Sequence, residues 1–219
     1  MTASARDREQ PGSVDSGHGN RSARVGRPPL TERRKAATRL EIAREAVRLF
    51  GAQGVAETSG EDIARAVGVS VRTLWRYFPS KEQCVRPLLT GGLDSVIAHL
   101  RAWPRDRPLS EAIGEQWRGV TPEEAGLTQE LIRLAAREPG LHAVWLEVHH
   151  DAEAVFADFV AQRTGRHADD LAVRVQAVIM NGAMRVGAEE WARSGNRDPD
   201  AHGLAVRAAW RTALEGLAC

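Results

Sequence analysis

The sequence predicts an all-α protein. Apolar residues recur three or four positions apart through most of the chain, which is the spacing of a helix face. No stretch after Lys81 shows the alternation of apolar and polar residues that is typical of a strand. With 219 residues, of which 42% are hydrophobic, the chain can bury a substantial core as one large domain or two small ones.

The first expected helix follows an N-terminal arm. Ile42, Ala46 and Phe50 fall on one face of this helix, and Gly54 helps to end it. Residues 1–30, by contrast, contain Gly, Ser, Pro and Arg with almost no large apolar side chains. Because such a segment buries too little surface to offset the entropy of ordering, we expect a disordered basic arm.

Two short helices joined by a tight turn are expected next. Thr58 or Ser59 caps the start of the first, the turn is Gly68-Val69-Ser70, and Ser70 caps a second short helix that runs from Val71 to Tyr77. With the preceding helix, these segments predict a three-helix domain over residues 31–81 that contains a helix-turn-helix.

The rest of the chain, residues 82–219, is expected to form a larger helical domain. Proline and glycine residues divide it into helices, and these helices start near Lys81. The expected ranges are 81–102, 109–119, 123–138, 141–164, 168–194 and 200–217.

Charge is distributed unevenly along the chain. Residues 1–86 carry 16 Lys or Arg and 10 Asp or Glu, whereas the remaining residues carry 14 and 19. A basic head on an acidic body suggests that only the head contacts a polyanion. Duplex DNA is such a partner, because neutralising its phosphates supplies most of the non-specific affinity of DNA-binding proteins.

The start of the second short helix, which runs from Val71 to Tyr77, carries side chains that are suited to reading DNA bases. In a helix-turn-helix, this end of the recognition helix enters the major groove. Arg72 can donate two hydrogen bonds to guanine, and Thr73 can bond to a base or a phosphate. A methyl group of Val71 or Thr73 can touch a thymine methyl, although Val71 covering only the helix junction is an open alternative.

Other residues suit the DNA backbone and the minor groove. Phosphate contacts are expected from Ser59, Trp75, Tyr77 and Lys81. Packing of Trp75 against the first helix is an alternative, and a helical hairpin unrelated to DNA is the alternative for the whole motif. Arg27 lies between Gly26 and Pro28, in a pattern similar to cores that lay an arginine in a narrow minor groove, and a merely solvated tail is equally open.

This part of the chain strongly resembles the tetracycline-repressor (TetR) family of transcriptional regulators. Two positions depart from the family pattern: Trp75 stands where tyrosine is usual, and Gly60 stands where a longer side chain often contacts a base. The base reading is therefore expected to fall on Arg72 and Thr73. The residues that carry the resemblance are Ala46 to Phe50, Gly54, Thr58-Ser59, Ile63-Ala64, Gly68-Val69-Ser70, Thr73 to Phe78 and Pro79 to Glu82.

The resemblance implies a homodimer. A single helix-turn-helix reads few base pairs, so specificity generally needs two copies about 34 Å apart on DNA. In the family, the last two helices of each subunit form a four-helix bundle between subunits, and here those helices are 168–194 and 200–217. Ordinary packing within one subunit is an alternative for the same apolar residues.

The resemblance also implies a cavity for a small effector, expected to be hydrophobic or acyl-CoA-like, among the middle helices. Such pockets are mostly apolar with few polar groups, and Met and Trp adapt to large ligands. Plain core packing is the alternative for each candidate. The candidate lining residues are Trp117, Leu131, Leu134, Trp145, His149, Phe156, Met180 and Met184.

No catalytic, cofactor or metal site is expected. The sequence contains no nucleophile elbow or phosphate loop, and His149 and His150 are adjacent rather than four positions apart as metal pairs on a helix require. The two cysteines are expected to be reduced thiols. With no long apolar run or secretory signal, the protein is expected to be cytoplasmic and to avoid membranes.

The function that these features predict is a sequence-specific regulator of transcription. A repressor released from a palindromic operator by a small hydrophobic effector is the expected form. An architectural DNA-binding protein that ignores small molecules and a helical enzyme with a basic tail are the alternatives.

Overall fold

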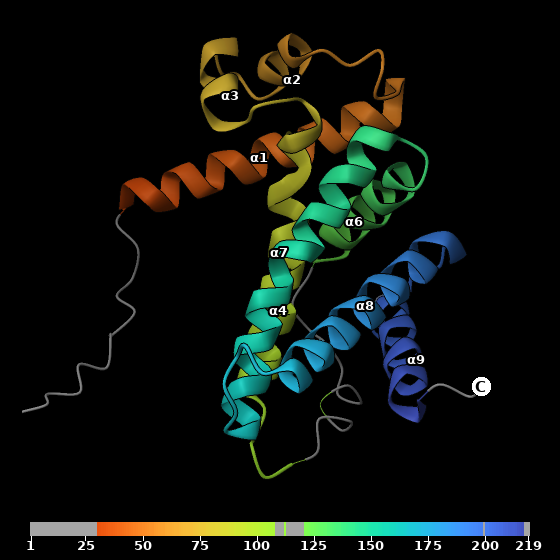
Figure 1. Cartoon of the computed structure of the whole chain (residues 1–219). Coiled ribbons are helices and arrows are strands. Elements are labelled where there is room, and N and C mark those ends of the chain that lie inside the picture. The colour runs from red at the N-terminus through yellow and green to blue at the C-terminus, as the bar shows by residue number, and fades with distance from the viewer. Residues whose placement is uncertain (1–29, 108–111, 113–120, 199, 217–219) are drawn as a thin grey trace, which may run out of the picture.

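The computed structural model describes residues 30–107, 112, 121–198 and 200–216, and these residues form helices and connecting turns without a strand (Figure 1). The predicted all-α class is confirmed. Arg27 and the rest of the expected arm up to residue 29 lie outside the described residues, as do Trp117 and all of the expected helix 109–119 except Ala112. The helices are α1 (Leu30–Gln53), α2 (Gly60–Ala66), α3 (Val71–Tyr77), the 3-10 turn η1 (Glu82–Val85), α4 (Arg86–Ala102), α6 (Pro122–Ala135), α7 (Pro139–Thr164), α8 (Leu171–Ser194) and α9 (Ala201–Glu215).

Helix ends differ from the expected ones by a few residues, for local reasons. Helices α6 and α7 begin at Pro122 and Pro139 instead of 123 and 141, because proline is well suited to the first turn of a helix. Helix α8 begins at Leu171 instead of 168, because the side chain of Asp170 accepts the backbone N–H of Ala172 at 2.9 Å and caps the helix there. The helix expected to start at Lys81 instead begins as η1 and becomes α-helical at Arg86.

Helix α1 connects the two parts of the molecule. Figure 1 shows α2 and α3 beside one stretch of α1, and α4, α6 and α7 extending away from it on the opposite side. Ile42, Ala46 and Phe50 of α1 are at most 1% exposed, and α1 packs against α2, η1, α4 and α6. Since one apolar core runs through both parts, the division at residue 81 stays a prediction based on the sequence.

Helices α8 and α9 cross at short range. A Cβ atom on Gly187 of α8 would lie 2.6 Å from the Cα of Val206 on α9, so only glycine allows this approach. The rings of Trp191 and His202 lie 4.6 Å apart between the same two helices. Helix α8 also packs along α7, which places the pair α8 and α9 against the body (Figure 1).

Two further observations concern membranes and thiols. Within the described ranges, no helix combines the length and the apolar character needed to cross a bilayer. Cys84 is a free, buried cysteine, and burial raises the pKa of its thiol to about 12. A thiol with such a pKa stays protonated and is a poor nucleophile.

The buried imidazole of His202 makes stability depend on pH. Burial lowers the pKa of His202 to about 4, below the value of about 6.5 for an unfolded chain. The unfolded chain therefore binds the proton more readily, so the stability that neutral His202 contributes is complete above pH 6.5 and is lost as the pH falls toward 4. We expect His202 to account for a loss of about 2 kcal/mol between pH 7 and pH 5.

Urea unfolding of the wild type and of His202→Gln at both pH values measures this contribution. The variant should lose less stability on acidification than the wild type does. His142→Gln removes an exposed histidine from α7 and is the matched control, which should keep the wild-type dependence. Equal pH dependence in wild type and His202→Gln would contradict the assignment.

Candidate nucleic-acid interface and ligand cavity

Local hydrogen bonds define the start of α2. The backbone N–H and the hydroxyl of Ser59 donate to the carboxylate of Asp62 at 3.0 and 2.6 Å, and the N–H of Asp62 donates back to the Ser59 hydroxyl at 3.2 Å. The Ser59 hydroxyl and backbone hydrogen bonds hold the pKa of Asp62 below its usual range. This capping box confirms Ser59 as the N-cap. The hydroxyl proton of Ser59 is already donated to Asp62.

The turn between α2 and α3 has the predicted geometry. Gly68 has a φ of +68°, a left-handed conformation that glycine adopts without a steric clash. The N–H of Val69 then donates to the carbonyl of Ala64 at 3.0 Å, which closes the turn. Ser70 caps α3, because its hydroxyl accepts the N–H of Thr73 at 3.1 Å. Ile63, Ala64, Leu74 and Phe78 are buried between the two helices and α1.

The first turn of α3 places the three predicted base-reading residues together. Arg72 is exposed, whereas Val71 and Thr73 are half-buried, and Val71 packs against the core. The hydroxyls of Thr73 and Ser70 lie 2.8 Å apart. Arg72 is therefore the side chain with the greatest reach from this end of the helix.

Trp75 and Gly60 form one packed unit. The indole is 42% exposed and lies over α2 at Gly60, where an added Cβ would be 2.1 Å from Cζ2 and 2.5 Å from Cη2. The tryptophan ring thus fills the space that a side chain at position 60 would take. The two departures from the family pattern are explained by this single contact, which the sequence by itself did not reveal.

Tyr77 lies in a basic cluster that the sequence reasoning missed. The guanidinium carbons of Arg39 and Arg76 are each 5.3 Å from the centre of its ring. The exposed N-terminal half of α1 adds Arg33, Arg34 and Lys35. The signal was present in the sequence as basic residues on two segments, but only the packing of α3 beside α1 brings Arg39 to Tyr77.

Lys81 points inward. Its ammonium donates to the carbonyls of Val55, Ala56 and Thr58 at 2.6, 3.4 and 3.0 Å. All three hydrogens of the ammonium thus have acceptors in the loop between α1 and α2. This contact ties the segment that follows α3 to the loop that precedes α2.

Ion pairs also connect α1 to α6. Arg48 donates to Glu123 at 2.6 Å, and Arg44 pairs with Glu124. The hydrogen bond from Arg44 is the main reason that the pKa of Glu124 lies below its usual range. Both carboxylates are in the first turn of α6, where they also interact favourably with the helix dipole.

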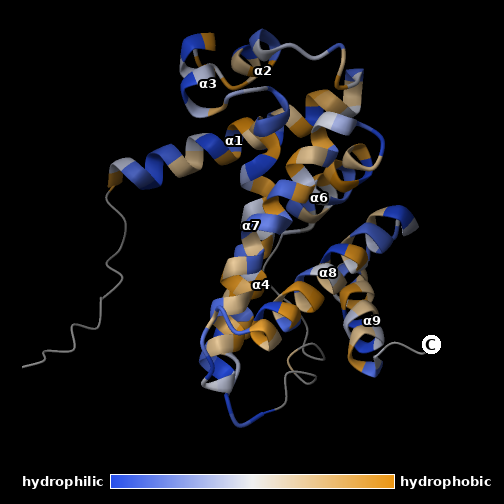
Figure 2. Ribbon diagram, viewed as in Figure 1, coloured by the Kyte–Doolittle hydropathy of each residue, from blue (hydrophilic) through white to orange (hydrophobic). Residues whose placement is uncertain are grey.

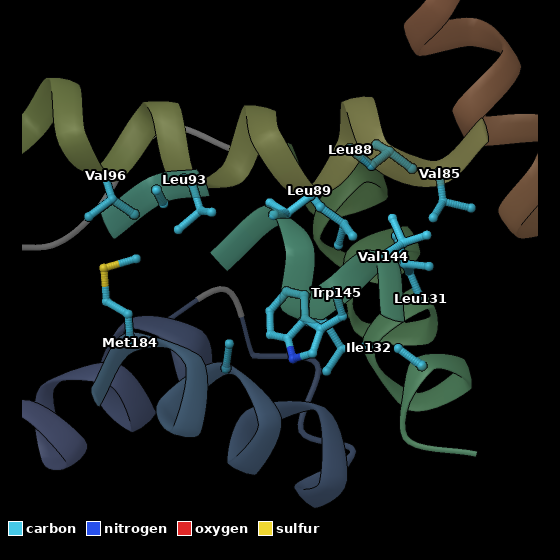
Figure 3. Close-up of a cluster of buried hydrophobic side chains, with 14 of the residues drawn as sticks. Val85, Leu88, Leu89, Leu93, Val96, Leu131, Ile132, Val144, Trp145 and Met184 are labelled. Carbon is cyan, nitrogen blue, oxygen red and sulfur yellow. The ribbon is translucent and has the colours of Figure 1, made fainter. Parts of the chain in front are cut away.

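An inner cavity of about 50 Å³ lies among α4, α6, α7, α8 and α9. Trp145, His149 and Met184, three of the candidates for an effector pocket, line this cavity. Figure 3 shows Trp145 directed toward Leu89 of α4, and Met184 reaching from α8 toward Leu93 and Val96. The remaining wall is apolar, apart from Thr128 and His202, and is formed by Leu88, Leu89, Gly92, Leu93, Val96, Ile132, Ala188 and Val206.

The other predicted pocket residues lie elsewhere in the core. Leu131 and Phe156 are fully buried, whereas Leu134 and Met180 are half-buried and pack against the core, and none of the four lines the inner cavity. Their role as ligand contacts stays a prediction. The residues of α4 that do line it were missed, although their apolar spacing in the sequence was visible.

An outer cavity of about 470 Å³ adjoins the inner one, and the two share Gly92, Thr128 and His202. Its wall includes Arg48 and Glu123, the ion pair between α1 and α6, and also Arg133 and Arg197. A cavity of this size is in the range of small-molecule sites. It is more polar than the inner cavity and lies beside the contact between α1 and α6.

His149 is the most buried polar group of the inner cavity. Its side chain is 5% exposed, lies edge-to-face with Trp145 at 4.2 Å, and contacts Asn181 of α8 through Nδ1 at 2.8 Å. The neighbouring His150 is exposed and lies 3.6 Å from Glu153. Across the described part of the chain, no three His, Cys, Asp or Glu side chains gather as a metal site would require.

Helices α8 and α9 present an apolar outer face. Figure 2 shows apolar residues along much of both helices. Several of them are large and roughly half exposed or more, whereas Trp191 of α8 is buried in the core. The exposed members are Leu171, Val175, Val178, Ile179 and Val186 of α8 and Leu204 and Leu214 of α9.

Comparisons with known proteins agree with this geometry. Residues 42–88 match the family of bacterial regulatory proteins named tetR, and residues 107–216 match the MftR C-terminal domain. The chain is 30% identical over 192 residues to the HTH-type transcriptional regulator TcmR of Streptomyces glaucescens, covering 83% of this chain and 85% of that protein. It is 29% identical over 168 residues to MftR of Mycobacterium tuberculosis, named for the regulation of mycofactocin biosynthesis, covering 74% and 83%.

Solved structures share the fold. A TetR-family regulator from Syntrophomonas wolfei superposes with a TM-score of 0.53 at 18% identity, covering 84% of this chain and 98% of the other. FadR of Thermus thermophilus, a TetR-family repressor solved with lauroyl-CoA, gives 0.52 at 20% identity, covering 83% and 95%. With matches to both halves and a relative at 30% identity over most of its length, the chain belongs to the TetR family of transcriptional regulators.

Proposed function

We propose that this regulator is a homodimeric repressor that occupies a palindromic operator and leaves it when a small apolar effector binds to the body. The observation that carries the proposal is the exposed Arg72 on the capped first turn of α3, a helix whose last residue, Tyr77, lies beside Arg39 of α1. In this proposal the protein acts by binding alone, without catalysis.

Base reading is assigned to Arg72 and Thr73, with Val71 in contact with a thymine methyl group. An exposed guanidinium can form a bidentate pair with guanine, which is worth about 1–3 kcal/mol of discrimination against a wrong base. Gly60 offers no side chain to share this role, and the indole that covers it directs its N–H toward the backbone of the DNA in this proposal. Specificity thus rests on a short stretch of α3.

Backbone contacts are assigned to Trp75 and Tyr77, with Arg39 and Arg76 adding positive charge beside the phenol. At Ser59, the hydroxyl proton is used by Asp62, so a phosphate there would be bound by backbone N–H groups of the first turn of α2. Lys81, whose three hydrogens are engaged by the α1–α2 loop, acts by holding that loop in place. Arg27 is proposed to enter the minor groove.

Dimerisation is assigned to the apolar outer face of α8 and α9. A patch of large apolar side chains that are between 46% and 74% exposed is costly in water and is typical of a surface that another chain covers. A second copy is the proposed partner, because a symmetric dimer presents two α3 helices to two half-sites of an operator.

Effector binding is assigned to the two adjoining cavities. An apolar portion would lie near Trp145, His149 and Met184, and a polar portion near the outer arginines. The pair Arg48–Glu123 borders the outer cavity and also joins α6 to α1. A ligand that engages Arg48 would loosen this connection and change the position of the head. To shift a dimer from mostly bound to mostly released, an effector needs a roughly 10⁴-fold preference for the released state.

Arg72→Ala tests the assignment of base reading. DNase footprinting on the DNA upstream of the protein's own gene should show a protected palindrome with the wild type. Because a bidentate guanine contact would be lost, we expect the variant to need about tenfold or more protein for the same protection.

Arg101→Ala, which removes the same charge from an exposed site on α4, is the matched control and should protect as the wild type does. Absence of a protected palindrome with the wild type contradicts the proposed function. Protection that covers all sequences equally indicates an architectural DNA-binding protein instead.

Gly60→Ala tests the packing of Trp75. The added methyl group would overlap the end of the indole, which is half exposed and able to swing away. We expect the indole N–H signal of Trp75 in a proton–nitrogen NMR spectrum to shift, with a stability change below about 1 kcal/mol. Trp75→Phe identifies the signal, and Gly91→Ala on α4, where the space is open, is the control. An unmoved Trp75 signal would rule out the contact.

Ile179→Asp tests the dimer face. A buried carboxylate in the middle of the α8 face would oppose association, so the variant should sediment as a monomer while the wild type sediments as a dimer. Leu146→Asp on α7 makes the same change at an exposed leucine outside that face and should remain dimeric. The assignment fails if Ile179→Asp and Leu146→Asp have the same mass.

A further inference from the structure

One residue that lines the inner cavity has a buried polar atom without a hydrogen-bond partner in the described part of the chain. The Nε2 atom of His149 is buried and has no hydrogen-bond partner among the residues that the structure describes. His149 lines a cavity whose walls are otherwise almost entirely apolar. Leaving a buried polar atom unpaired costs about 1–3 kcal/mol, which makes this atom an exception that calls for a partner.

The hydrogen bonds of Asn181 determine which nitrogen of His149 carries the proton. The amide nitrogen of Asn181 donates to the backbone carbonyl of His149 at 2.7 Å. A carbonyl oxygen only accepts, so the other amide atom, Oδ1, must be the one that faces the imidazole at 2.8 Å. Since Oδ1 also only accepts, Nδ1 must donate to it and therefore bears the proton.

The second nitrogen is then an acceptor. Burial, which is the main cause, lowers the pKa of His149, and the nearby Arg185 acts in the same direction, so the ring is neutral near pH 7. In a neutral ring protonated at Nδ1, the Nε2 atom presents only a lone pair. Glu189, whose charge acts in the opposite direction on the pKa of His149, is engaged by the indole of Trp145 and by Arg185, both at 2.8 Å.

We propose that His149 selects the effector, and that the effector must present a hydrogen-bond donor, a hydroxyl or an N–H group, on an otherwise apolar molecule. This proposal rests on the proposed function, because it assigns the chemistry of the ligand at the same effector site. A ketone, ester or carboxylate directed at Nε2 would set two acceptors against each other and would be rejected. A metal ion would need further ligands, which the described residues do not gather there.

The size of the cavity supports a small polar contact at the end of a larger ligand. About 50 Å³ holds a few water-sized groups, enough for a donor and its attached carbons. In this proposal the bulk of a larger molecule extends toward the outer cavity past Gly92, Thr128 and His202, the three residues that line both cavities. Sites built to bond a hydroxyl discriminate strongly against analogues that lack it, because the site's own polar atom is then left unpaired.

The test uses two rigid probes of matched shape, 2-naphthol with a hydroxyl and 2-methylnaphthalene with a methyl group at the same position. Equilibrium dialysis against the full chain should show that 2-naphthol binds about tenfold or more tightly than 2-methylnaphthalene. In His149→Phe this ratio should fall to near one. His149→Gln, which keeps a polar group near the position of Nε2, should restore part of the preference.

Two further measurements keep the test decisive. His149→Phe leaves the oxygen of Asn181 without its donor, so the double variant His149→Phe/Asn181→Leu repeats the measurement with both partners replaced by apolar groups. Nitrogen NMR of the wild-type histidines should show an unprotonated Nε2 on His149, whose signal moves on adding 2-naphthol and not on adding 2-methylnaphthalene.

Equal affinities of the two probes, binding of neither, a preference that survives in both phenylalanine variants, or a protonated Nε2 each overturn the proposal. None of these readouts involves DNA. A regulator that protects its operator but treats the probes alike would retain the proposed function and lose only this inference. A protein that prefers 2-naphthol but protects no palindrome would lose the proposed function.

Discussion

The burial of Ile42, Ala46 and Phe50 on α1 joins the two ends of this molecule. All three side chains are buried, and α1 packs against α2 as well as against η1, α4 and α6. Full burial of one such side chain stabilises by about 1.5–3 kcal/mol, whereas an exposed ion pair contributes about 0–1 kcal/mol. Apolar burial therefore holds α1 in place, and the half-exposed pair Arg48–Glu123 adjusts the contact between α1 and α6. A regulator needs this combination, because its head must be firmly attached and still be movable.

The contact between α1 and α6 is also where the proposed effector site meets the head. Arg48 borders the outer cavity, and Glu123 belongs to the first turn of α6, the helix that forms part of the cavity wall. A ligand that binds Arg48 can break this weak, exposed ion pair at a small cost in free energy. It cannot displace the buried side chains of Ile42, Ala46 and Phe50 on α1. In the proposed mechanism, the energetic contrast between these two interactions would let a ligand change DNA binding without unfolding the core.

The pair His149–Asn181 is a different kind of constraint. A polar atom placed in an apolar interior needs a hydrogen-bond partner. The contacts between His149 and Asn181 satisfy every polar side-chain atom of the pair except Nε2 of His149, a residue that lines the inner cavity. Replacing both residues by apolar ones is often neutral for stability. The arrangement is therefore better understood as serving recognition than as stabilising the body.

Sequence alone determined the helical class, the capped helix-turn-helix and Arg72 at its exposed end, because caps, turns and helical periodicity depend on residues close together in the chain. The family resemblance also suggested candidate pocket residues, of which Trp145, His149 and Met184 line the inner cavity. It did not predict that Trp75 covers Gly60, that Lys81 turns inward, that Arg39 lies beside Tyr77, or that Leu131 and Phe156 lie away from the cavity. Those facts depend on how helices distant in sequence cross, and only the tertiary structure decides which neighbour each side chain meets.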